Sequence, residues 1–103
     1  MKRKELAHFQ TQGGVSLDGE ENLINNVTPI IEKLVKHLLA LPEKASKPTI
    51  LNLFKKCILS INNFHDEIET VERESILEII YTLGEIVGVD PASEFAEEWR
   101  GDW

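Results

Sequence analysis

Five carboxylates lie in the eleven-residue stretch HDEIETVERES, which runs from His65 to Ser75. Such a cluster could bind a metal ion, supply a general acid and base, or form a surface for a positively charged partner. Carboxylate-bridged metal centres in helical bundles combine Glu-x-x-His pairs with glutamates from facing helices. The stretch contains no such pair, and the histidines of the chain have no zinc-ligand spacing with its single cysteine. We therefore expect no metal ion and no other cofactor, and the plain alternative is a solvated acidic helix face.

The sequence also lacks a suitable arrangement of residues for covalent or acid–base catalysis. Cys57 falls among apolar residues with helical spacing, where a cysteine acts as a small core residue. A catalytic thiol needs exposure and a neighbouring base. The clustered acids lie on a polar face, without the apolar pocket that raises the pKa of a catalytic carboxyl group. We therefore predict that the protein is not an enzyme.

The net charge of −7 is concentrated in the second half of the chain. Residues 66–103 contain twelve acids and two arginines, which gives this part a net charge of −10. Such a surface repels phosphate backbones, so nucleic-acid binding is disfavoured. A basic protein would instead be attracted to it and would associate faster.

Three further features predict a cytoplasmic protein. No apolar run approaches the roughly 20 residues that a membrane helix needs. The basic start MKRKELAHFQTQGGV lacks the continuous apolar segment of a secretory signal. Because Cys57 is the only cysteine, no internal disulfide can form, which suits a reducing compartment.

Prolines and N-cap residues mark the expected helix boundaries in the first half of the chain. Asp18 and Glu21 have the spacing of a capping box, which predicts a short helix near 19–26. Proline disrupts a helix interior but suits a first turn. We therefore expect a second helix to begin at Pro29 and to end before Pro42.

The same signals predict the helices of the second half. Pro48, with Ser46 or Lys47 as the residue before the helix, suits the first turn of a third helix. Asp66 and Glu69 form another possible capping box, so a fourth helix would begin there and end at Gly88. Carboxylates in a first turn complement the helix dipole, which would explain half of the acidic cluster. A last short helix would follow Asp90.

The spacing of the apolar residues predicts an all-α fold, a small helical bundle of three main helices plus short terminal helices. Residues 18–103 would form this single helical-bundle domain. Residues 1–17 have no sustained periodicity and are expected to be a flexible N-terminal arm, because chain ends usually fray. The alternative is an arm fastened by apolar residues such as Leu6 and Phe9. Trp99 and Trp103 would either cover the core or anchor a partner. As a cover, Trp99 would be the more buried of the two.

The segment DEIETVERESILEIIYTLGEIVGVD and the terminal RGDW resemble a family of small bacterial α-helical proteins of unknown function. The resemblance covers the last third of the chain and implies the same fold. Gly101 is an insertion relative to the family's terminal R-D-W. The residues that match are Glu67, Ile68, Glu69, Thr70, Arg73, Glu74, Gly88, Asp90, Arg100, Asp102 and Trp103.

Two roles follow for the matching residues and their acidic neighbours. One is structural, an ion-pair network that fastens the end of the chain to the last long helix. Its expected members are Glu69, Arg73, Glu74, Arg100 and Asp102. The other is partner contact, with an aromatic anchor surrounded by charges. Its expected members are Glu67, Glu72, Glu94, Glu97 and Trp103.

The size and acidity of the chain are similar to those of bacterial immunity proteins, which neutralise a toxin by covering it. We therefore expect a non-enzymatic binding protein, an immunity protein, whose partner is a basic protein such as a toxin. No nucleic acid or membrane is expected as a partner. The alternative is a homo-oligomeric or adaptor helical bundle.

Overall fold

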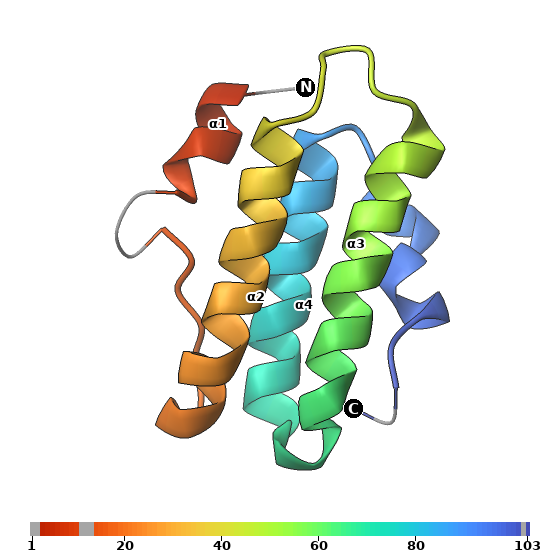
Figure 1. Ribbon diagram of the computed structural model, residues 1–103. Coiled ribbons are helices and arrows are strands. Elements are labelled where there is room, and N and C mark those ends of the chain that lie inside the picture. Colours follow the sequence, from red (N-terminus) through yellow and green to blue (C-terminus); the bar gives the residue numbers. More distant parts are fainter. Residues whose placement is uncertain (1–2, 11–13, 102) are drawn as a thin grey trace.

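The computed structural model describes residues 3–10, 14–101 and 103. Three long helices form its body, and they lie side by side along most of their length (Figure 1). They are α2 (Glu21–Leu39), α3 (Lys47–Ile61) and α4 (Thr70–Ile86). The described residues include no strand, so the predicted all-α bundle with three main helices is confirmed. The short elements are α1 (Arg3–His8) and the 3-10 turns η1 (Asn62–Glu67), η2 (Pro91–Ser93) and η3 (Phe95–Glu98).

Helix α2 is continuous, which corrects the prediction of separate helices near 19–26 and from Pro29 onward. Pro29 is exposed in the middle of α2 and removes one backbone hydrogen bond. The apolar stripe is buried on both sides of it, and each buried large side chain contributes about 1.5–3 kcal/mol. That burial outweighs the lost bond. The helix begins after Glu20, whose carboxylate accepts a 3.0 Å bond from the Leu23 amide, and not after Asp18.

Helix α3 follows its predicted signals. The Ser46 hydroxyl accepts a 3.3 Å bond from the Thr49 amide, and Pro48 lies in the first turn. The apolar residues that face inward are all buried: Ile50, Phe54, Cys57, Ile58 and Ile61. The position of α3 in the bundle is therefore set by the stripe that the sequence displays.

Helix α4 begins later than predicted, because η1 and an extended residue precede it. Ile68 is 8% exposed and has extended backbone angles, so the chain places this side chain in the core before the helix starts. The N-cap residue is Glu69, whose amide donates a 3.0 Å bond to the Glu72 carboxylate. The prediction of Asp66 as N-cap is wrong, since Asp66 lies in the exposed part of η1.

Two alternatives were predicted for residues 1–17, a flexible arm and an arm fastened by apolar residues. In α1, the structure shows the second. Leu6 is completely buried in the core. The Arg3 guanidinium donates bonds to the carbonyls of Leu39 and Leu41, at 2.8 and 2.5 Å. Helix α1 therefore covers the end of α2.

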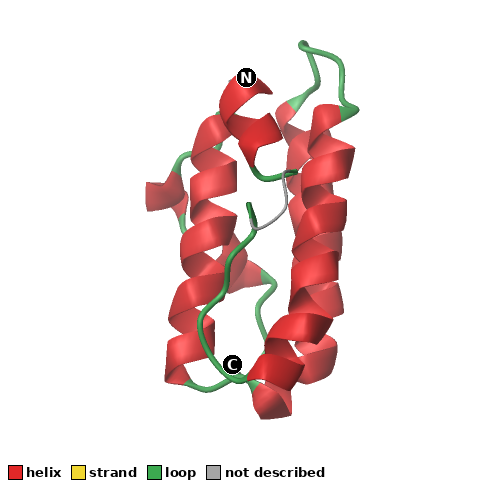
Figure 2. Cartoon of the chain, turned by 90° about the vertical axis from the view of Figure 1, so that its left-hand side faces the viewer, coloured by secondary structure: helices red, strands yellow, loops and turns green. Residues whose placement is uncertain are grey.

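Residues 14–20 run along the side of the bundle from α1 to the start of α2 (Figure 2). The Asp18 amide donates a 2.9 Å bond to the Ser75 hydroxyl of α4. Gly19 has a φ of 136° and packs directly over the Glu72 side chain. This segment joins the start of α2 to the first turns of α4.

Candidate functional site

The exposed side of α4 is acidic. Glu74, Glu78 and Glu85 are all exposed. Residues four and eleven positions apart lie on one side of an α-helix, so these three carboxylates form a single stripe. None of them has a lysine or arginine three or four positions away. Within the described part of the chain, no ion pair involves any of the three.

Aromatic packing places η3 beside this stripe. The Phe95 ring packs edge-on against Phe54 of α3 and Tyr81 of α4, with centroid separations of 5.2 and 5.1 Å. Gly84 of α4 makes room for it, since a Cβ atom there would lie 3.0 Å from the ring. Phe95 thus fixes the turn that carries Glu94 and Glu97.

The carboxylates of η3 are close enough to α4 to affect its chemistry. Burial raises the pKa of the Tyr81 hydroxyl, and the negative charges of Glu97 and Glu94 raise it further. Tyr81 therefore stays neutral at physiological pH and can donate a hydrogen bond. We name five exposed acids the acidic face: Glu74, Glu78 and Glu85 of α4, Glu97 of η3, and Glu94 immediately before η3.

One cation lies at the edge of the acidic face. The Arg100 guanidinium donates to the Glu97 carboxylate at 2.6 and 2.9 Å and also to the carbonyl of Trp103. Arg100 therefore compensates the charge of Glu97 in part, whereas the exposed acids of α4 form no ion pair with any described residue.

The structure does not bring all of the predicted partner-binding residues together on one surface. Glu94 and Glu97 are exposed on the acidic face, as expected. Glu67 is also exposed, but it lies in η1 beyond the start of α4. Eleven residues of helix separate Thr70 from Tyr81, a rise of about 16 Å. Glu67 and the acids of η3 are therefore near opposite ends of α4.

The structure contradicts the prediction that Glu72 is an exposed partner-binding residue. Its side chain is buried, with 6% of the residue exposed. The carboxylate accepts from the Glu69 amide at the start of α4, and Gly19 covers it. Glu72 lies at the third position of the helix, where a glutamate completes a capping box. Its role is structural.

Trp103 is also buried and cannot be an exposed anchor for a partner. It is 4% exposed, whereas Trp99 is only partly buried, so the predicted order of burial is wrong. The Trp103 indole donates a 2.6 Å bond to the Asn62 side chain, which also accepts from the Gly101 amide at 2.9 Å. The Asn62 amide group donates to the carbonyl of Trp99 at 2.9 Å. Asn62, and not an acid of α4, fastens this segment.

The predicted ion-pair network does not form among the residues that the structure describes. Arg100 bonds to Glu97 and Trp103 rather than to α4. Arg73 and Glu69, four positions apart, form no ion pair, and Glu74 points to solvent on the acidic face. Asp102, the remaining member, lies outside the described residues.

The described part of the chain contains no cluster of metal-ligating side chains, and its cysteine is buried. Glu5 and His8 of α1 have the Glu-x-x-His spacing, but no group of three or more ligating side chains occurs among residues 3–10, 14–101 and 103. Cys57 is 6% exposed, and burial raises the pKa of its thiol to about 12. The reactive thiolate is therefore nearly absent at neutral pH.

We predict that native Cys57 reacts slowly with a thiol reagent at pH 8, and that chemical unfolding accelerates the reaction at least about tenfold. The unfolded thiol ionises near its ordinary pKa of 9.0, whereas the folded one keeps its proton to about 12. The folded state thus binds more protons between these values, and stability falls as pH rises through this window. Absorbance of released thionitrobenzoate measures the reaction. Equal rates in the folded and unfolded states would contradict the burial.

No family model, no curated protein and no solved structure matches this chain. In the described residues, no helix is both long and apolar enough to cross a membrane.

Two residues of the acidic face, Glu78 and Glu85, are not among the site residues predicted from the sequence. Their spacing from Glu74 is the signal that would have identified them, because together they form one side of a helix without a compensating cation. Asn62 had no comparable signal. Its three hydrogen bonds join residues 37 to 41 positions apart, so only the folded chain brings these groups together.

Proposed function

We propose that this chain is a non-enzymatic binding protein whose acidic face docks a basic protein partner, as a bacterial immunity protein docks its toxin. The observation that supports the proposal is that the exposed carboxylates of α4 have no lysine or arginine three or four positions away to compensate their charge. Glu74 and Glu78 are four positions apart, and like charges at this spacing destabilise a helix by about 0.2–0.5 kcal/mol. A purely structural helix gains nothing from this arrangement.

The position of Glu85 supports the same proposal. It lies in the last turn of α4, which contains no basic residue. A negative charge there opposes the partial negative charge of the helix end, at a cost of about 0.3–1 kcal/mol. A basic partner would reverse both penalties, because its cations would complement the carboxylates and the helix end together. A cytoplasmic location, where such a partner would be neutralised before it acts, is part of the proposal.

The partner proposed here is a cationic protein, and its contact would combine charge with limited apolar area. Tyr81 is half-buried beside the stripe, and tyrosine is enriched at interface centres. Val71 is 55% exposed on α4. These two residues provide apolar contact, while the carboxylates steer the encounter.

The test uses the triple variant Glu74→Gln, Glu78→Gln, Glu85→Gln and, as candidate partner, any basic protein whose gene adjoins the gene for this chain. We expect association to slow by about tenfold or more at low salt, because exposed charges act mainly on encounter rates. The salt dependence should flatten as well. Surface plasmon resonance at two ionic strengths measures both quantities. Thermal unfolding should show unchanged or slightly higher stability, since the like-charge pair is gone.

The matched control is Glu21→Gln, Glu32→Gln, Glu43→Gln, which removes the same charge from exposed positions on α2 and the following turn. Its association rate should stay within about threefold of the parent chain, since only the long-range charge effect changes. If both triple variants associate equally slowly, net charge and not the acidic face is responsible. If no basic protein encoded by an adjoining gene binds the parent chain, the proposal fails.

A further inference from the structure

A small groove lies between α2 and α3 on a side of the bundle that the acidic face does not occupy. Its volume is about 100 Å³. The floor consists of Ile30 and Leu34 from α2 and of Leu53 and Cys57 from α3. Ile30 and Leu53 are only partly buried, so the apolar floor is open to solvent.

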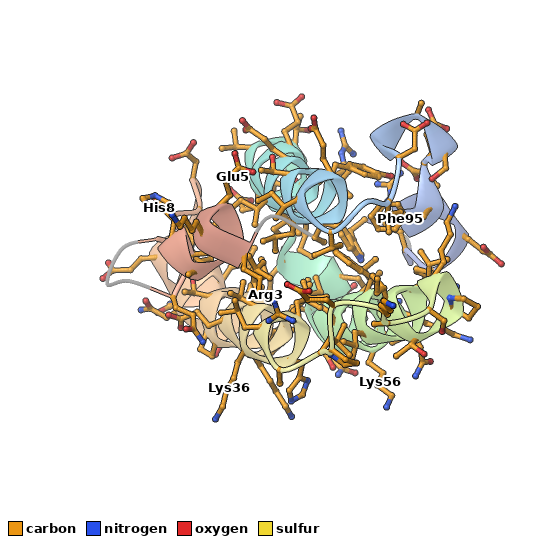
Figure 3. The ribbon with its side chains drawn as sticks, turned by 90° about the horizontal axis from the view of Figure 1, so that it is seen from above. Arg3, Glu5, His8, Lys36, Lys56 and Phe95 are labelled. Atoms are coloured by element: carbon orange, nitrogen blue, oxygen red, sulfur yellow. The ribbon has the colours of Figure 1, made fainter. Side chains whose placement is uncertain are left out.

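The rim of this groove is basic. Lys33 and His37 line it from α2, and Lys56 lines it from α3, whereas no acid is among the lining residues. All three rim residues are exposed. Figure 3 shows Lys56 projecting from α3 on the side of the bundle away from α4. This positive region is notable on a chain whose net charge is −7.

The dimensions of the groove favour one kind of occupant. Its lining spans Ile30 to His37 on one helix and Leu53 to Ser60 on the other. Seven residues of helix rise by about 10 Å, which is two turns. Two turns present two or three apolar side chains at spacings of three and four, the pattern with which amphipathic helices fill a groove. An acyl chain that spans half of the roughly 30 Å hydrocarbon core of a membrane is about one and a half times as long.

We propose that the groove between α2 and α3 docks an acidic amphipathic helix of a second protein. Its apolar side chains would lie on Leu34 and Leu53, and its carboxylates would meet Lys33 and Lys56. Apolar contact and charge complementarity together would set affinity and orientation. This inference goes beyond the proposed function, because the partner has the opposite charge and contacts different helices. The chain would thus join a basic protein to an acidic one.

The probe for this proposal is a fluorescein-labelled peptide of about 14 residues with leucine at every third or fourth position and glutamate or alanine elsewhere. A second peptide carries lysine in place of each glutamate. Fluorescence anisotropy measures both affinities for the full chain. We expect the glutamate peptide to bind at least about tenfold more tightly than the lysine peptide.

The decisive variant is Lys33→Glu, Lys56→Glu, which should weaken binding of the glutamate peptide by at least about tenfold. Its matched control is Lys36→Glu, Lys55→Glu, which changes the same charge on the same two helices outside the groove. The control should lose no more than about threefold. Thermal unfolding verifies that both variants fold. The Glu74→Gln, Glu78→Gln, Glu85→Gln variant should bind the glutamate peptide as the parent chain does. This result would distinguish the groove from the acidic face.

Four results would overturn the proposal. The first is that the glutamate peptide does not bind, or binds no better than the lysine peptide. The second is an equal loss in both lysine variants. The third is binding to phosphatidylglycerol vesicles in place of the peptide, which would identify a membrane as the occupant. The fourth is self-association in sedimentation velocity that the Lys33→Glu, Lys56→Glu variant abolishes, which would identify a second copy.

Discussion

Gly19→Ala is expected to lower the free energy of unfolding by about 3 kcal/mol, through backbone strain and loss of a helix cap. Gly19 has a φ of 136°, a region that side-chain-bearing residues rarely adopt. An alanine Cβ atom would also overlap the Glu72 carboxylate, which is buried beneath it. To make room, Glu72 would have to release the Glu69 amide that it caps. Urea unfolding followed by circular dichroism measures the change.

Gly88→Ala is the matched control for this prediction. Gly88 also has a positive φ, of 90°, but nothing lies within 4 Å of a Cβ atom placed there. It should therefore show the strain alone, about 1–2 kcal/mol. The difference between the two variants measures the overlap with Glu72. If both lose the same stability, the contact between Gly19 and Glu72 contributes nothing.

A double-mutant cycle gives an independent measure of that contact. Glu72→Ala alone should cost about 1 kcal/mol through the lost cap. In the background of Glu72→Ala, the Gly19→Ala change should cost about 1 kcal/mol less than in the parent chain, because the overlap is gone. Strict additivity of the two changes would show that the carboxylate does not lie under Gly19.

Trp103→Ala is expected to lower stability by about 3–5 kcal/mol, the range for deletion of a buried aromatic side chain. The indole is 4% exposed, and its nitrogen donates to Asn62. Arg100 lies over the ring, 5.5 Å from the centroid, so the cation also loses a contact. Thermal or urea unfolding of the purified variant measures the loss. A change of less than about 1 kcal/mol would be consistent with a surface tryptophan and would contradict the packing.

Two companion variants separate the packing of Trp103 from its hydrogen bond. Trp103→Phe keeps an aromatic ring but leaves Asn62 without the indole donor, and should cost about 1–2 kcal/mol. Asn62→Ala removes three hydrogen bonds and should cost about 2–4 kcal/mol. Trp99→Ala, at a partly exposed position, should cost less than Trp103→Ala. If Trp99 proves the more important residue, the assigned order of burial is wrong.

The sequence by itself determined the helical class and the inward stripes. Apolar residues recurring at three and four positions have one face to bury, whatever the arrangement of the neighbours. This is why the apolar residues that recur at helical spacing along α3, including Ile50, Cys57 and Ile61, are buried. The Ser46 cap is similarly local, since acceptor and donor are three residues apart. The acidity of the second half is a matter of composition alone.

Tertiary structure determines which of the helix-boundary signals in the sequence are used. Asp66 and Glu69 had the spacing of a capping box, but burial of Ile68 favoured the later start at Thr70. Pro29 had the properties of a first-turn residue, but the stripe on both sides of it kept α2 continuous. In each case the free energy of burying large apolar side chains exceeds that of a single cap or backbone bond.

Tertiary structure also determines which acids are exposed and which are buried. Glu72 and Glu74 are two residues apart in one helix, yet the first is buried and the second is exposed. The difference depends on Gly19, which is 53 positions before Glu72 in the chain and packs over its carboxylate. A carboxylate can be buried there because the Glu69 amide donates to it. Such a long-range contact leaves no periodic pattern, so only the folded chain distinguishes the structural acid from those available to a partner.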